Sequence, residues 1–193
     1  VINLFSDVDK EFSLFDPKFL EEISKMKEKN LAVELLKKLI AEQVHIYRHT
    51  NVVKSQKFSE IIQRVMNAYL NGMLTNEQVI EELLNMAKQM KAAHQEGNKM
   101  GLTSEELAFY DALTKPDAIK DFYKNEELIA LTKELVDTLR KNKQKRESAR
   151  AKMRIMIRRL LKRHRYPPEG EEDAVQIVMT QCELWTDSND MED

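Results

Sequence analysis

The segment TNEQVIEELLNMAKQMKAA, residues 75–93, carries the clearest structural signal in the chain. Thr75 and Gln78 have the spacing of a capping box, in which each side chain bonds the backbone N–H of the other residue at the start of a helix. Apolar residues then recur at intervals of three and four, which places them on one helical face. These inward positions are Val79, Leu83, Met86, Ala87 and Met90. The segment therefore predicts an amphipathic helix packed against a core.

Similar signals occur on both sides of this segment. Asp16-Pro17 combines an N-cap residue with Pro at the first helical position, and Thr103 with Glu106 forms a second capping box. In the long helix that starts near residue 31, the predicted inward stripe is half a cylinder wide and includes Ile46. We expect helices over about 16–27, from 31 onward, and over 55–70, 75–93, 103–113, 126–141, 148–165 and 171–185. With only 4 Gly, only 4 Pro and no strand pattern, the chain is predicted to be all-α, a bundle of about seven or eight helices.

Four regions can be distinguished along the chain. Residues 1–15 mix apolar and acidic residues without a period, and we expect an extended lead-in there. A loop predicted at 97–101 is the best candidate for a boundary between two packed helical subdomains, 16–101 and 102–186, the second containing a basic helix. Residues 187–193 are mostly acidic and polar, and we expect a disordered tail.

Composition indicates a folding protein that does not cross a membrane. Hydrophobic residues make up 42% of the chain and charged residues 33%, and no run approaches the roughly 18 apolar residues of a membrane helix. Acidic residues interrupt the apolar start, so no signal peptide is visible. A single cysteine cannot form an internal disulfide, and we expect a reducing, cytoplasmic setting. Because the chain opens with Val1 and not Met, we expect it to be part of a longer protein.

The net charge of −2 hides a strong asymmetry. Residues 140–168 contain 13 Lys and Arg against a single acidic residue, Glu147, whereas residues 169–193 contain nine acidic residues and no Lys or Arg. This division indicates either an anionic partner for the basic segment or its internal neutralisation by the acidic one.

Motifs for catalysis are absent from the sequence. There is no G-x-x-x-x-G-K-[ST] loop for nucleotide phosphates and no G-x-S-x-G motif, and Cys182 lies in an apolar stretch where we interpret it as a small buried hydrophobe. Glu42, His45 and His49 share the polar side of one helix but lack a fourth metal ligand, so we interpret them as solvated surface residues. A metal-dependent hydrolase built on these three residues is an alternative that a metal analysis would test. We expect no catalytic, cofactor-binding or metal-binding residue in this chain.

Residues 146–165 are predicted to form a helix with one apolar and one cationic face. The apolar face contains Ala149, Met153, Met156, Ile157, Leu160 and Leu161. The candidates for contact with a partner or with phosphates are Arg150, Arg154, Arg158, Arg159, Lys162 and Arg163. Ile155 points outward among these cations and is a candidate apolar anchor. Three interpretations stay open: phosphate binding, docking onto an acidic protein, or a solvated face balanced by the acidic tail.

The last predicted helix, 171–185, is apolar on most sides and ends at Trp185. A large aromatic residue in this position can fill a core or act as an interface hot spot. We favour the core and also keep Trp185 among the candidate contact residues.

Several segments of the chain follow the pattern of one protein family. They are KRESARAKMR at 145–154, YPP at 166–168, FSLFD at 12–16 and LTSEELAFYDAL at 102–113. Together these segments, in this order, resemble the C-terminal region of the R (motor) subunits of type I restriction enzymes, and the resemblance covers nearly the whole chain. The chain departs from the family where Lys143 runs directly into Gln144, because members usually carry a short segment with an Ile/Val-Asp-Trp element there.

The resemblance implies a division of labour within a larger subunit. In this family a metal-dependent nuclease and an ATP-driven DNA translocase precede a helical region that attaches the motor to the methyltransferase core. A non-catalytic docking module is therefore implied, with the modification (methyltransferase) subunits as partners and with ATP and Mg²⁺ bound only by the rest of the parent subunit. The alternative is a module that binds the DNA backbone directly through the basic helix 146–165, which a steep salt dependence would reveal.

Overall fold

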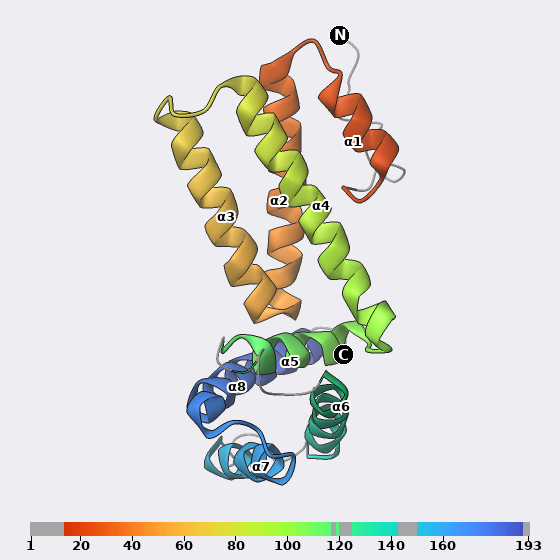
Figure 1. Ribbon diagram of the computed structural model, residues 1–193, viewed down its shortest axis with the longest axis vertical. Coiled ribbons are helices and arrows are strands. Elements are labelled where there is room, and N and C mark those ends of the chain that lie inside the picture. Colours follow the sequence, from red (N-terminus) through yellow and green to blue (C-terminus); the bar gives the residue numbers. More distant parts are fainter. Residues whose placement is uncertain (1–13, 117–118, 120–124, 143–149, 191–193) are drawn as a thin grey trace. The chain divides into compact units, whose positions relative to one another are not determined.

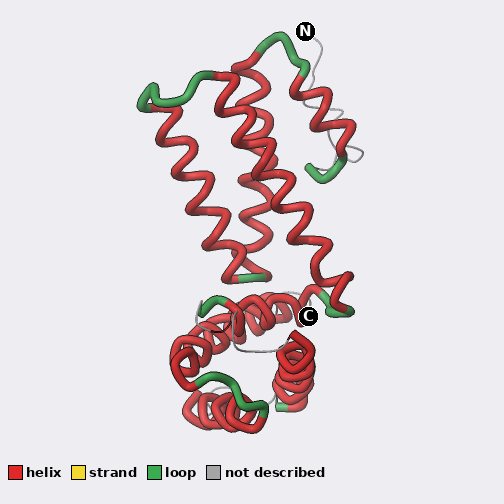
Figure 2. Tube along the Cα trace, in the orientation of Figure 1, coloured by secondary structure: helices red, strands yellow, loops and turns green. Residues whose placement is uncertain are grey.

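The computed structural model describes residues 14–116, 119, 125–142 and 150–190, the last five of them in backbone only. Every regular element in these residues is an α-helix and none is a strand (Figures 1 and 2). The helices are α1 (Pro17–Ser24), α2 (Lys29–Thr50), α3 (Val52–Leu70), α4 (Asn76–Met100), α5 (Ser104–Thr114), α6 (Asn125–Lys141), α7 (Arg150–Arg163) and α8 (Pro168–Asp190). The predicted all-α class is thus confirmed for the described part of the chain.

By its internal contacts the chain divides into two compact units. Unit 1 comprises residues 1–45 and 57–96, and unit 2 comprises residues 46–56 and 97–193. The division falls inside α2, α3 and α4, so the turn between α2 and α3 belongs to the same unit as the C-terminal helices. The predicted extended lead-in lies outside the described residues, apart from 14–15.

Unit 1 is built on the inward faces of α1 to α4. All the positions predicted to face inward in α4 are buried. The largest fully buried side chains of the unit come from all four helices: Ile23, Leu36, Ile40, Phe58, Leu83, Met86 and Met90. Because burial of one such side chain contributes about 1.5–3 kcal/mol, this shared core is the main source of stability for the unit.

Capping hydrogen bonds define the starts of three helices. The backbone N–H of Thr75 donates to Gln78 Oε1 at 2.9 Å, and the backbone N–H of Gln78 donates to Thr75 Oγ1 at 3.2 Å. Thr103 and Glu106 form the same reciprocal pair at the start of α5, and Asp16 caps α1 through its side chain. The capping predictions are therefore confirmed at all three positions.

In unit 2, α5 packs against α6 and α8, and α7 packs against α6 and α8 (Figure 1). Their inward faces share one continuous core. Its fully buried members include Phe109, Leu113, Leu131, Leu135, Ile157, Leu161, Ala174 and Val175. The Tyr166 hydroxyl donates to the backbone carbonyl of Leu113 at 2.6 Å and ties the turn between α7 and α8 to α5. These contacts fix α7 and so determine where its outward side chains point.

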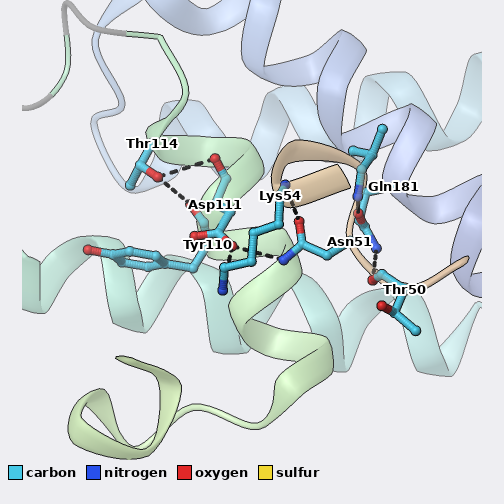
Figure 3. A network of polar contacts seen from close by, with 8 residues as sticks. Thr50, Asn51, Lys54, Tyr110, Asp111, Thr114 and Gln181 are labelled. Carbon is cyan, nitrogen blue, oxygen red and sulfur yellow. Dashed lines mark hydrogen bonds and ion pairs between the residues drawn. The ribbon is translucent and has the colours of Figure 1, made fainter. Parts of the chain in front are cut away.

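A buried polar network joins the turn between α2 and α3 to α5 and α8 (Figure 3). Lys54 Nζ lies 3.3 Å from Asp111 Oδ2, and Asn51 Nδ2 donates to the same oxygen at 2.9 Å. Gln181 Oε1 accepts from the backbone N–H of Val52 at 2.9 Å, and its Nε2 donates to the last carbonyl of α2 at 2.9 Å. Because these groups satisfy one another, the turn can be buried without the cost of unpaired polar atoms.

The prediction of a loop at 97–101 is wrong. Helix α4 continues to Met100, and only Gly101, with φ +70°, adopts a left-handed turn conformation. Gly97 is a helical residue at a close approach: a Cβ there would lie 3.1 Å from the carbonyl oxygen of Leu102 and 3.2 Å from Leu107 Cδ2. A glycine that signals a loop in the sequence instead allows close packing within unit 2.

Two further predictions need correction. Helix α8 runs to Asp190, so residues 187–190 of the predicted disordered tail are helical, while 191–193 lie outside the described residues. No Gly or Pro follows Gly170 to end this helix earlier. Ile46, predicted to face inward, is 52% exposed, because the apolar stripe of α2 is wider than the face that the helix buries.

Candidate docking surface on helix α7

Helix α7 lies with its apolar face toward the core of unit 2, as its residue pattern predicts. Ile157, Leu160 and Leu161 are buried, and Met153 and Met156 pack against the core while partly exposed. The first residues of the predicted basic helix, 146–149, and the junction of Lys143 with Gln144 lie outside the described residues.

The side of α7 that faces α8 is cationic and is largely neutralised by α8. Arg158 Nη2 lies 2.6 Å from Glu172 Oε2, and Arg154 Nη1 lies 3.8 Å from the other oxygen of the same carboxylate. Arg150 forms an ion pair with Glu183. With Arg163, which pairs with Glu134 of α6, four of the six cations predicted to contact a partner have an anionic neighbour in their own unit.

Near its C-terminal end, α7 meets α6 at a shared carboxylate. Glu134 forms an ion pair with Arg163 and contacts His164 Nε2. Burial lowers the pKa of His164 below its ordinary value of 6.5, and the Arg163 guanidinium acts in the same direction, whereas Glu127 opposes them. His164 is therefore mainly neutral at pH 7 and adds little positive charge to this surface.

An open groove of about 570 Å³ lies between α6 and α7. It is lined by Thr138, Lys152, Ile155, Met156, Arg159, Leu160 and Arg163. Ile155 is 48% exposed, an unusual position for a large apolar side chain. Lys152 and Arg159 are exposed and form no ion pair with any residue that the structure describes, and the same holds for Lys162, which is exposed on α7 beyond the groove lining.

The groove lining suits a segment that is both apolar and acidic. Ile155, Met156 and Leu160 offer apolar surface, and no Asp or Glu lies among the lining residues. Covering the exposed half of Ile155 would contribute about 1 kcal/mol. Carboxylates opposite Lys152 and Arg159 would add electrostatic complementarity.

Trp185 does not line this groove. Its ring meets Phe109 edge to face with centroids 5.9 Å apart, and the Arg140 guanidinium carbon lies 5.9 Å from the ring centroid. Within the described residues, its buried indole N–H has no acceptor. Trp185 therefore packs against the core of unit 2 and is not brought together with Ile155.

The predicted contact residues are thus separated by the structure. Ile155 and Arg159 belong to the groove, as does Arg163 with its partner from α6. Lys152 lines the groove and was missed, although it lies three residues before Ile155 on the same side of the helix. The pairing of the α7 arginines with particular α8 carboxylates was also missed, because it depends on how two distant segments pack.

The other candidate sites remain surface or core features. Glu42, His45 and His49 are exposed on α2, and among the described residues no three His, Cys, Asp or Glu side chains are placed to share a metal ion. Cys182 is buried in the core of unit 2. None of the described helices has both the length and the apolar character needed to cross a membrane.

Comparison with known proteins identifies the family. Residues 1–188 match the family model described as "Type I restriction enzyme HindI endonuclease subunit-like, C-terminal". The chain belongs to this HindI-like C-terminal family. Its relatives include the type I restriction enzyme HindI endonuclease subunit of Haemophilus influenzae, which is 35% identical over 190 residues, 95% of this chain and 18% of that protein.

A second relative of this HindI-like chain comes from Methanocaldococcus jannaschii and carries the name of the MjaIXP endonuclease subunit of a type I restriction enzyme. It is 35% identical over 113 residues, which cover 58% of this chain and 11% of that protein. No solved structure matched the chain. The chain thus spans less than a fifth of the length of either relative.

Proposed function

We propose that this chain is a docking module of a type I restriction enzyme R subunit, which attaches the ATP-driven DNA translocase and endonuclease to the modification (methyltransferase) subunits. The observation that carries the proposal is the groove beside α7. There an exposed Ile155 lies with Lys152 and Arg159, which form no ion pair with any described residue. Membership of the HindI-like family supports the setting, because the relatives are named as endonuclease subunits.

The groove favours a protein partner over DNA. A nucleic-acid backbone offers phosphates to the cations but no apolar group to cover Ile155, whereas an acidic amphipathic segment of a protein offers both. Charge on the rim would steer the encounter, and the apolar contact would retain the complex. We therefore assign the groove to an acidic surface on a modification subunit.

The proposed role is positional and not catalytic. ATP and Mg²⁺ would be bound by other parts of the parent subunit, and this region would hold the motor in place. We propose a cytoplasmic setting, which is consistent with a lone, buried Cys182.

A double variant tests the proposal. We expect Ile155→Asp combined with Arg159→Glu, introduced into the full-length subunit, to weaken binding to the modification subunits by more than about tenfold and to abolish co-purification. Asp removes the apolar contact, and Glu repels an acidic partner. Circular dichroism should be unchanged because both side chains are exposed.

Lys133→Glu provides the matched control, since it reverses an exposed cation on α6 of the same unit without touching the groove. Assembly should survive in this control. The proposal is wrong if the double variant still co-purifies with the modification subunits, or if the control loses assembly to the same extent.

Direct binding to the DNA backbone is a second candidate function. It is favoured by three exposed cations that pair with no residue in the described part of the chain: Lys152, Arg159 and Lys162. If several phosphates are contacted, DNA affinity of the chain should fall steeply between about 50 and about 200 mM salt. Ile155→Asp alone separates the two functions: it should impair protein docking strongly and backbone binding only slightly. Absence of DNA binding at low salt would remove the second candidate.

A further inference from the structure

The face of α7 that turns toward α8 carries a regular row of arginines: Arg150, Arg154 and Arg158. Residues four apart lie one above another on a helix, about 6 Å apart along its axis. This arginine row does not line the groove proposed for docking. It is a second cationic surface on the same helix, directed to a different side.

Side chains of α8 already occupy this arginine row. Glu172 lies between Arg154 and Arg158, at 3.8 Å and 2.6 Å from their guanidinium nitrogens. Glu183 pairs with Arg150 at the other end of the row. In addition, Arg154 donates to Gln176 Oε1 at 3.4 Å. The carboxylates take the positions in which the arginines would otherwise hold phosphate oxygens, since guanidinium binds both groups with the same geometry.

The solvent exposure of these ion pairs indicates that they affect polyanion binding more than folding. Both glutamates are well exposed, and so are the arginines in part or in full. Exposed ion pairs contribute little to folding because water already solvates both charges. Their effect on an approaching polyanion is larger, because each carboxylate neutralises a cation and repels phosphate.

We propose that the arginine row is a latent polyanion-binding site, suited to a nucleic-acid phosphate backbone, that Glu172 and Glu183 of α8 keep occupied. Internal neutralisation suppresses DNA binding on this side of α7, whereas Lys152 and Arg159 of the groove have no ion-pair partner among the described residues. Loss or displacement of the α8 carboxylates converts the row into a backbone-binding surface. This inference does not depend on the docking role, because neither the arginine row nor Glu172 and Glu183 line the groove.

The test compares two doubly substituted forms of the 193-residue chain with the unsubstituted chain. Glu172→Gln with Glu183→Gln removes the carboxylates from the row, whereas Glu169→Gln with Glu171→Gln removes the same charge from positions of α8 for which the structure gives no arginine partner. The probe is a fluorescent 20-bp DNA duplex, and anisotropy is measured between about 50 and about 200 mM salt.

We expect Glu172→Gln with Glu183→Gln to raise DNA affinity by at least about tenfold at the lowest salt and to steepen the slope of log affinity against log salt by about two to three, the value for three newly available arginines. Adding Arg150→Gln, Arg154→Gln and Arg158→Gln should cancel the gain. Melting temperatures of all forms should agree closely, because exposed pairs stabilise little.

Two results would overturn the inference. One is an unchanged DNA affinity in the Glu172→Gln, Glu183→Gln form. The other is an equal gain in DNA affinity in the Glu169→Gln, Glu171→Gln form. That result would show that the net charge of the chain matters, and not the pairing of Glu172 and Glu183 with the arginine row. Co-purification with the modification subunits should be retained in both forms, so failure here is distinguishable from failure of the docking proposal.

Discussion

The buried pair formed by Lys54 and Asp111 makes unit 2 sensitive to the loss of a single side chain. Their side chains are 8% and 13% exposed, and Asn51 donates a further hydrogen bond to the same carboxylate oxygen. A buried pair with its hydrogen bonds complete adds little over an apolar contact of the same shape. Removing one partner is costly, because the charge that stays behind is buried and loses the ion-pair neighbour that offsets its desolvation.

We predict that Asp111→Ala lowers the free energy of unfolding by about 3 kcal/mol, measured by urea denaturation. Asp137→Ala is the matched control, since it also removes an aspartate paired with a lysine, but its pair with Lys141 is exposed at 61% and 73%. The control should lose less than about 1 kcal/mol. Equal losses in the two variants would show that burial of the network does not matter.

For single residues, hydrogen bonds between near neighbours in the sequence can be predicted, whereas those between distant residues cannot. Thr75 and Gln78 are three residues apart, so their capping box can be recognised from spacing alone. Asn51 and Asp111 are 60 residues apart, and Val52 and Gln181 are 129 apart. No local pattern predicts such partners, because only the packing of α5 and α8 brings them together.

Among the elements, the end of α7 shows backbone strain that can be tested. Arg165 has φ +57°, the one non-glycine positive φ found in the described residues, and the backbone N–H of Tyr166 closes the turn on the carbonyl of Leu161 at 2.9 Å. The left-handed conformation is about 1–2 kcal/mol less favourable for a residue with a Cβ because of steric crowding. The turn retains this conformation because it leads the chain from α7 into α8, which packs against α7.

We expect Arg165→Gly to raise the free energy of unfolding by about 0.5–1 kcal/mol, since glycine adopts this conformation without steric cost but loses more entropy on folding. Gly101→Ala tests the same physics in the opposite direction: its φ is +70° and an added Cβ would meet nothing within 4 Å. That variant should lose about 1 kcal/mol. Thermal unfolding measures both, and a loss at Arg165→Gly would contradict the assignment of strain.

Helix positions were predictable where a cap and the apolar period agree, as in α4, or where a capping box alone marks the start, as in α5. Helix ends were not predictable where one glycine has two possible roles. Gly97 has the appearance of a loop residue but lies in α4 because Leu107 packs closely on it. For α7 the apolar face could be predicted, whereas the division of its cations into paired and unpaired sets required the position of α8.

At the scale of the whole molecule, our proposals give the two sides of α7 different roles: the groove docks a protein partner, and the arginine row is kept from DNA. The arginine row faces the carboxylates of α8, whereas Lys152 and Arg159 lie exposed beside Ile155 and pair with no residue that the structure describes. The family match sets this arrangement in the C-terminal region of an endonuclease subunit, of which the chain covers 18% in the HindI relative. We propose attachment as the role of this region and motor and nuclease functions for the rest of the subunit.

Photo-crosslinking from position 155 measures what covers the groove. A photoreactive amino acid replaces Ile155 in the full-length subunit, which is then assembled with the modification subunits and DNA and irradiated. We predict a crosslink to a modification subunit, within a segment rich in Asp and Glu, and no such crosslink from the same amino acid at Lys133. Crosslinks from position 155 to DNA alone, or none to a modification subunit in a complex that still assembles, would contradict docking through this groove.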